Sequence, residues 1–184
     1  PLHAAEHFYI VTENIGLPST LPVLRDPSSW IYAKEDTGKM LVGCFEPKSK
    51  PRPLSTIPED FSFGQFEEDW EHFEPAMLNA IHRIPKLENA GIHTFFNGPE
   101  SFTPDDRYIL GEAPELKNFF VAAGFNSIGI QSAGGAGKVL SEWITNGYPP
   151  MDLWDVDIRR FHSFQGNSRY LKERTKEALG LLYA

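Results

Sequence analysis

The chain has 184 residues, of which 41% are hydrophobic and 13% aromatic, and this composition can support a packed core. Its formal net charge is −8 without a basic tract, so neither nucleic acid nor an anionic membrane is expected as a partner. The single cysteine, Cys44, excludes an intramolecular disulfide, and no C-x-x-C or H-E-x-x-H pattern predicts a metal site. No apolar run approaches the roughly 20 residues that span a bilayer.

The beginning of the chain predicts strands. His7–Asn14 has the β-branched and aromatic content of a strand. Residues 30–36 and 39–46 flank Thr37-Gly38 and predict a β-hairpin with a short glycine-containing turn. The prolines that follow predict an extended connection.

A helix and two further strands are predicted next. Between residues 66 and 84, apolar residues recur at spacings of three and four, which indicates a helix. Pro75 must lie in the first turn of that helix or kink it, and Pro85 ends it. Residues 93–102 and 107–113 then predict strands joined by an Asp-rich turn at Thr103–Asp106.

The stretch FFVAAGFNSIGIQSAGGAGKVLSEWITNG predicts a strand at Phe119–Phe125, a glycine-rich loop and a helix that ends at Asn146. Gly147 is suited to the left-handed position after that helix. A charged helix is predicted at about Arg169–Leu182. Antiparallel strands with two or three helices define an α+β fold.

The glycine-rich loop has two interpretations from its spacing alone. A loop that opens a helix presents unpaired N–H groups and the positive end of the helix dipole, which favour an electron-rich group. Gly134, Gly135 and Gly137 could equally let the helix lie close to a sheet, and spacing by itself favours that packing role.

A longer block carries a family resemblance. The residues GPESFTPDDRYILGEAPELKNFFVAAGFNSIGIQSAGGAGKVLSEWITNG (98–147) resemble the sarcosine and dimethylglycine dehydrogenases of the flavin-dependent amine and D-amino-acid oxidase superfamily. The likeness extends upstream through GQFEEDWEHFEPAMLNAIHRIPKLENAGI (64–92) and EHFYIVTE (6–13). It therefore covers nearly the whole chain.

The resemblance implies a particular domain organisation. Residues 1–115 would form a substrate-binding lobe with an antiparallel sheet, 116–147 the last strand, loop and helix of a split FAD-binding domain, and 148–184 a linker and helix. In this family the G-x-G-x-x-G loop for the FAD pyrophosphate and the histidine bonded covalently to FAD precede this region. A tetrahydrofolate-binding domain often follows it. The chain starts at Pro1, so we expect it to be a fragment of a longer protein, inactive alone, whose exposed surfaces could self-associate.

The resemblance also implies the cofactor-binding residues. The loop after the final strand would lie against the pyrimidine end of the flavin, and its N–H groups would stabilise negative charge there during reduction. The matching positions are Gly124, Asn126, Ser127, Ile128, Gly129, Ile130 and Gln131.

Two residues match substrate-side positions. His7 resembles a histidine near the substrate in the dimethylglycine branch, and Tyr32 an active-site tyrosine. A neutral imidazole and a phenol could orient an amine or bond its carboxylate. By chemistry alone, His7 could be a satisfied histidine at a strand start, and Tyr32 a member of a cross-strand aromatic pair.

One position departs from the amino-acid oxidases. They use an arginine to bind the substrate carboxylate, and the comparable residue here is Glu100, as in the sarcosine and dimethylglycine branch. Arg52, Arg83 and Arg107 remain as carboxylate partners, although each also fits a solvated surface charge.

The resemblance predicts FAD-dependent oxidative demethylation of a small N-methylated amino acid of the sarcosine or dimethylglycine type. The alternative is a non-catalytic platform like the regulatory subunit of pyruvate dehydrogenase phosphatase, which shares this architecture. Expected partners are the small amine substrate and the FAD-binding half of the protein. The expected location is the cytoplasm in a bacterium or the mitochondrial matrix in a eukaryote.

Overall fold

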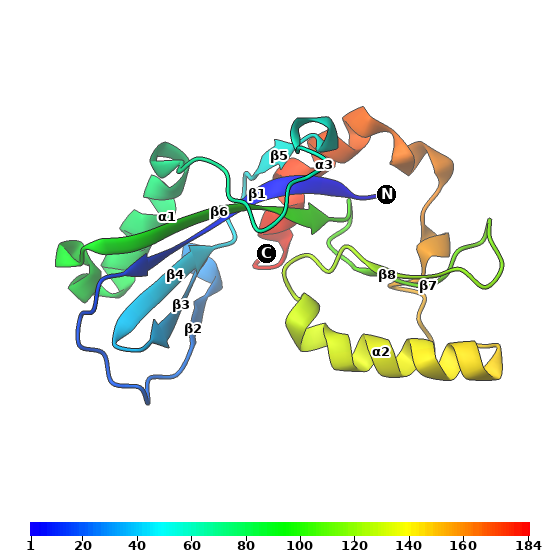
Figure 1. Cartoon of the computed structure of the whole chain (residues 1–184), viewed down its shortest axis with the longest axis horizontal. Coiled ribbons are helices and arrows are strands. Elements are labelled where there is room, and N and C mark those ends of the chain that lie inside the picture. The colour runs from blue at the N-terminus through cyan, green and yellow to red at the C-terminus, as the bar shows by residue number, and fades with distance from the viewer.

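The computed structural model describes residues 1–184, and its larger part is an antiparallel sheet of six strands (Figure 1). Antiparallel strands with three helices confirm the α+β prediction. None of the helices combines the length and apolar character needed to cross a membrane. The strands of the large sheet are β1 (His3–Thr12), β2 (Leu24–Asp26), β3 (Ile31–Asp36), β4 (Lys39–Cys44), β5 (Lys50–Arg52) and β6 (Ile92–Phe102).

The long strand β1 lies at the centre of this sheet. One edge pairs with β6 along its full length. The other edge is shared, because β5 pairs with residues 4–6 and β4 with residues 9–11. Strands β3 and β2 extend the sheet beyond β4. The side chains of β1 therefore alternate between two faces that several strands complete.

The predicted hairpin is confirmed. Strands β3 and β4 pair in register from Ile31↔Cys44 to Asp36↔Lys39. Thr37 and Gly38 form the turn with φ of 56° and 84°. Two consecutive residues with positive φ give the backbone a twist that matches the twist of the two strands, and this allows a two-residue turn.

Helix α1 (Trp70–Arg83) covers one face of the sheet. The Asp69 side chain accepts a hydrogen bond from the His72 N–H at 3.0 Å and caps the first turn. Pro75 lies inside the helix rather than in its first turn, and the helix ends before Pro85, as predicted.

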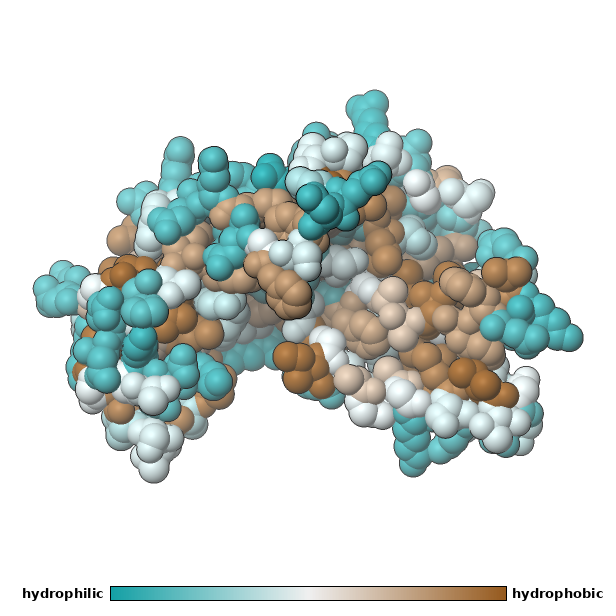
Figure 2. Space-filling model, in the orientation of Figure 1, coloured by the Kyte–Doolittle hydropathy of each residue, from teal (hydrophilic) through white to brown (hydrophobic).

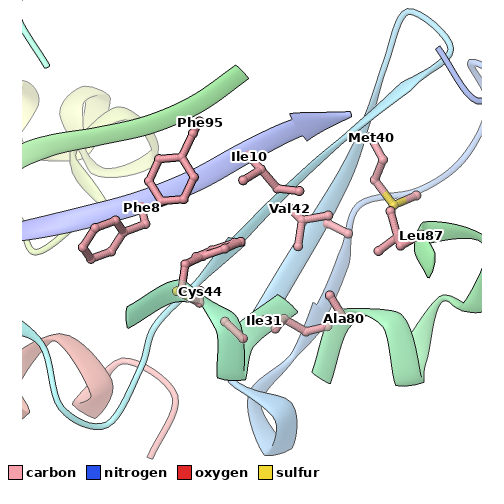
Figure 3. Close-up of a cluster of buried hydrophobic side chains, with 12 residues drawn as sticks. Phe8, Ile10, Ile31, Met40, Val42, Cys44, Ala80, Leu87 and Phe95 are labelled. Carbon is pink, nitrogen blue, oxygen red and sulfur yellow. The ribbon is translucent and has the colours of Figure 1, made fainter. Parts of the chain in front are cut away.

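The main core lies between α1 and this face (Figure 3). Phe8 and Ile10 of β1 are fully buried and point toward Ile31 and Val42 of the hairpin. Phe73, Ala76 and Ala80 of α1 close the cluster. Cys44 is a buried free thiol in this core, as expected of a small apolar strand residue, and burial raises its pKa well above the usual value.

A second unit follows β6. Strands β7 (Ile109–Glu112) and β8 (Phe120–Ala123) form an antiparallel pair, and helix α2 (Gly129–Asn146) lies beside them (Figure 1). Trp143 anchors α2 to this strand pair. Its ring packs edge-on against Phe120, with ring centroids 5.8 Å apart, and it occupies the space that a Cβ at Gly111 would need. Gly147 ends α2 with φ of 80°, as predicted.

Helix α3 (Ser168–Leu181) returns to the large sheet. Leu179 packs with Ala5, Phe45 and Phe102 in a second buried cluster, on the face of the sheet opposite α1. The division into residues 1–115, 116–147 and 148–184 stays a prediction.

The packing role considered for the glycines of α2 is wrong within this chain. Helix α2 begins at Gly129, so Gly134, Gly135 and Gly137 lie inside it. A Cβ added at any of these three positions would meet no atom within 4 Å. The face of α2 that carries them is therefore open.

Among the helix glycines, Gly180 of α3 is packed tightly against the backbone. A Cβ there would lie 2.8 Å from the Cα of Pro47 and 2.9 Å from the carbonyl oxygen of Glu46. Gly180→Ala should lower stability by about 1–3 kcal/mol, because backbone atoms cannot move aside as a side chain can. Thermal unfolding measures it, with Gly166→Ala, where nothing lies within 4 Å, as the matched control. Equal melting temperatures for the two variants would contradict this packing.

Candidate active site

The residues predicted to bind substrate and cofactor meet in the structure. His7 lies on β1, and the loop from Gly124 to Ile128 joins β8 to α2, whose first turn holds Gly129 to Gln131. The Ser127 Oγ of this loop lies 2.9 Å from Nδ1 of His7, although 120 residues separate them. Glu100 of β6 contacts both side chains through its Oε2. A cluster of three side chains thus joins the sheet to the loop.

The contacts of His7 in this cluster favour its protonated form. Its Nε2 lies 2.9 Å from the carbonyl oxygen of Cys44, which can only accept, so Nε2 carries a hydrogen. Nδ1 faces the Glu100 carboxylate, which binds a second N–H. Burial favours the neutral ring, but the hydrogen bond and charge of Glu100 outweigh it and raise the pKa of His7. Both ring nitrogens of His7 thus face groups of the chain, whereas the family resemblance implies an imidazole that faces the substrate.

Glu100 is the partner that sequence reasoning missed. Burial favours its neutral form, but hydrogen bonds from His7 and Ser127 outweigh this and lower the pKa of Glu100. Both of these bonds reach Oε2, whereas no hydrogen bond of the chain reaches Oε1, and the side chain is 32% exposed. Glu100 therefore keeps an oxygen that can accept a hydrogen bond from a ligand.

The loop is held in an uncommon backbone conformation. Gly124, Asn126 and Ser127 have φ of 62°, 49° and 67°, in the left-handed region that few side chains favour. The buried Asn126 side chain accepts from the Thr103 N–H at 2.9 Å and donates to the Thr103 hydroxyl at 3.1 Å. Asn126 thus holds the loop to Thr103, the residue after β6, and Ser127 holds it to Glu100 within β6.

This conformation leaves backbone donors unpaired at the start of α2. The N–H groups of Gly129, Ile130 and Gln131 donate to no group of the chain, and no side chain caps the helix. These three groups carry the positive end of the helix dipole. The prediction is corrected at Ile128, whose N–H donates to the Phe125 carbonyl at 2.9 Å.

Tyr32 lies flat on the face of the sheet that carries His7. Its ring crosses Gly43, where an added Cβ would lie 2.2 Å from the ring carbon Cζ and from the hydroxyl oxygen. On the same face Tyr9 stacks on Phe96 with ring centroids 4.6 Å apart. Burial raises the pKa of Tyr32, so its phenol stays protonated. Phe45 links this aromatic group to the cluster, since its ring lies 5.7 Å from Tyr32 and 5.0 Å from His7.

Helix α3 covers only the part of this face near Ala5, and the surface is hollowed between the sheet and α2 (Figure 2). Tyr32 packs beside the buried cluster around Ala5 with Leu182 and Tyr183, and Tyr9, Tyr32 and Phe96 are half-buried. We call the part of this face with Tyr9, Tyr32, Gly43 and Phe96, beyond α3 itself, the open face.

The other basic candidates are engaged elsewhere. Arg52 contacts Glu6 and lies over the Phe66 ring, Arg83 contacts Asp26, and Arg107 contacts Asp155. The ring nitrogen Nε2 of the half-buried His72 lies 3.1 Å from Oε1 of Glu46. No sequence spacing pairs Glu100 with Ser127, so only the fold could find the cluster.

The architecture and this loop define a class of protein. Residues 1–143 match the family described as FAD dependent oxidoreductase, and residues 146–184 match the FAD dependent oxidoreductase central domain. The chain belongs to the FAD dependent oxidoreductase family. The fold is similar to that of L-proline dehydrogenase from P. horikoshii, with a TM-score of 0.71 and 21% identity over 88% of this chain and 40% of that one.

Curated relatives align with the whole chain. The 4-methylaminobutanoate oxidase (formaldehyde-forming) of Paenarthrobacter nicotinovorans is 49% identical. The mitochondrial sarcosine dehydrogenase and the mitochondrial pyruvate dehydrogenase phosphatase regulatory subunit of Mus musculus are each 40% identical. The alignments cover 100% of this chain but only 20–22% of these relatives. The activity of the whole protein is therefore a matter for proposal.

The residues present fit part of an FAD site. Three unpaired N–H groups at a helix start suit the electron-rich carbonyl of a flavin ring, and no acidic side chain in the first turn of α2 opposes it. The chain has no G-x-G-x-x-G sequence for a pyrophosphate. These 184 residues would contact the ring end of the cofactor.

The contact between His7 and Glu100 makes the stability of the fold depend on pH. The folded-state pKa of His7 is raised, so its stabilisation is complete below its unfolded pKa of about 6.5 and is lost as pH rises through the folded value. The folded-state pKa of Glu100 is lowered, so its contribution is lost only as pH falls through that value. The melting temperature of the wild type should decline above pH 6.5 more steeply than that of His7→Gln. Parallel pH profiles would contradict the pairing.

Proposed function

We propose that the full-length protein uses FAD to demethylate a small N-methylated amino acid oxidatively. The observation that carries this proposal is the contact of His7 and Glu100 with Ser127, which lies two residues before the start of α2. It sets a charged, hydrogen-bonding cluster beside the unpaired N–H groups expected to face the flavin ring. The names of the oxidase and of the sarcosine dehydrogenase support the same chemistry.

Each group of the chain has a role in this proposal. The bound flavin supplies a hydride acceptor for the N-methyl carbon. The N–H groups of Gly129, Ile130 and Gln131 stabilise negative charge on the ring, without reorganising during the reaction. Glu100 presents Oε1 to the substrate nitrogen, and His7 holds Glu100 in place from the opposite side. Tyr32 and its neighbours exclude water from the methyl group.

Further parts of the proposal concern residues outside this chain. They are a covalent bond from a histidine to FAD, capture of the released one-carbon unit by tetrahydrofolate in a following domain, and contact with the FAD-binding half of the protein. We propose that the 184 residues alone are inactive and can self-associate. We also propose a location in the mitochondrial matrix for a eukaryotic protein and in the cytoplasm for a bacterial one.

A second function is a regulatory platform without catalysis. Its support is that the phosphatase regulatory subunit is as similar to this chain as the sarcosine dehydrogenase is, at 40% identity. The flavin spectrum of the purified full-length protein separates the two functions. Bleaching of the flavin absorbance by an N-methylated amino acid, with formaldehyde released, supports the enzyme. A colourless or substrate-insensitive protein supports the platform.

A substitution at Gly43 tests whether catalysis depends on the position of the Tyr32 ring. A methyl group from Gly43→Ala would occupy the place of the Tyr32 ring, so the ring must move off the open face. We expect kcat/KM for the best N-methylated substrate to fall by about 10- to 100-fold, since small displacements of positioning groups cost this much. Gly166→Ala, at an unrestricted site, should leave kcat/KM unchanged. Unchanged activity of Gly43→Ala would exclude Tyr32 from the active site.

A further inference from the structure

Two buried residues hold the loop before α2 from within the fold. Thr103 follows the last residue of β6 and is fully buried, and Asn126 lies in the loop after β8 with 2% of its surface exposed. The Thr103 N–H donates to Oδ1 of Asn126 at 2.9 Å, and Nδ2 of Asn126 donates to the Thr103 hydroxyl at 3.1 Å. We call this reciprocal pair of hydrogen bonds the latch.

The latch engages both polar atoms of the Asn126 side chain. All the hydrogen bonds that this side chain makes go to Thr103. A residue with so little exposed surface offers almost no area to a cofactor. Any influence of Asn126 on a cofactor therefore passes through the loop that it holds.

Thr103 meets the loop at a second point. A Cβ added at Gly124 would lie 2.7 Å from Cγ2 of Thr103, so the chain after β8 passes directly over this methyl group. Gly124 has φ of 62°, which glycine adopts without strain. The hydroxyl and the methyl group of Thr103 thus hold the loop at two positions that are two residues apart.

The latch supports a backbone conformation that costs free energy. Asn126 and Ser127 have consecutive φ of 49° and 67°, and the left-handed region is unfavourable for residues other than glycine. A released loop would therefore relax toward negative φ. Because α2 begins at Gly129, this change would alter the direction in which the chain enters the helix, and with it the direction of the unpaired N–H groups.

The latch is separate from the charged cluster. Ser127 contacts His7 and Glu100, whereas no hydrogen bond joins Thr103 or Asn126 to either of those two side chains. A substitution in the latch therefore changes the support of the loop and leaves His7 and Glu100 themselves in place.

We propose that Thr103 and Asn126 are positioning residues for the cofactor, and that the latch sets the reduction potential of the flavin by aiming the N–H groups at the start of α2. N–H groups aimed at the ring stabilise the negative charge that reduction places on it, which raises the potential. Loosening the loop should lower the potential. This inference rests on the proposed use of FAD and does not depend on which amine is oxidised.

Two substitutions at Thr103 separate hydrogen bonding from packing. Thr103→Val keeps the methyl contact but removes the hydroxyl, which leaves Nδ2 of Asn126 buried without its acceptor. Thr103→Ser keeps the hydroxyl and removes the methyl group. Reduction of the purified full-length flavoprotein with dithionite against a reference dye measures the potential.

Thr103→Val should shift the equilibrium toward oxidised flavin by about tenfold, less than the loss that follows removal of a whole preorganised donor. For a two-electron couple this is a fall in potential of about 30 mV. Thr103→Ser should keep a potential close to that of the wild type, because the latch remains.

Asn126→Gly removes the latch from its other side. Glycine accepts positive φ without strain, so this variant should fold and should also lower the potential. The double variant with Thr103→Val should lower it no further, since both substitutions break the same interaction. Thr145→Val is the matched control, because the Thr145 hydroxyl bonds the Ser141 carbonyl at an exposed position of α2, and it should leave the potential unchanged.

The outcomes separate the claims. A wild type that takes up no flavin would overturn the proposed function, and this inference with it. Flavin that stays oxidised with sarcosine and dimethylglycine would count against the demethylation alone, because the potential is measured without an amine. A wild-type potential in Thr103→Val or in Asn126→Gly would overturn the inference alone, as would equal shifts in Thr103→Val and Thr103→Ser, which would indicate packing. Where Thr103→Val does not fold, Asn126→Gly decides.

Discussion

The contact of Ser127 with Glu100 and His7 joins the two parts of the molecule at the point where chemistry is expected. Without it, the loop before α2 would depend on Asn126 alone to hold two left-handed non-glycine residues. His7 and Glu100 belong to strands β1 and β6, so the sheet sets the direction in which the loop runs. The loop predicted to contact the cofactor and the strand predicted to contact the substrate are thereby fixed to each other.

The central strand β1 explains why this arrangement is possible. Its alternation places Phe8 and Ile10 in the core under α1, and places His7 and Tyr9 on the opposite face. Gly43 and Gly98 on neighbouring strands leave room for rings that lie flat, since a Cβ at either would strike Tyr32 or Phe96. One strand thus supplies both the stability of the lobe and the surface of its site.

Local patterns predicted the elements well and the interactions between them poorly. The hairpin at Thr37-Gly38 and both helix ends near Pro85 and Gly147 follow from residues close in sequence, and the structure confirms them. The raised pKa of His7 depends on Glu100, 93 residues away, and no periodicity in the sequence predicts such a contact.

The direction of the amides at the start of α2 is the central claim, and a crystal structure of the full-length protein with its flavin measures it most directly. The account predicts N–H groups of Gly129, Ile130 or Gln131 within about 2.7–3.2 Å of a carbonyl oxygen of the flavin ring. Amides bonded instead to other parts of the polypeptide, with the ring placed elsewhere, would contradict it.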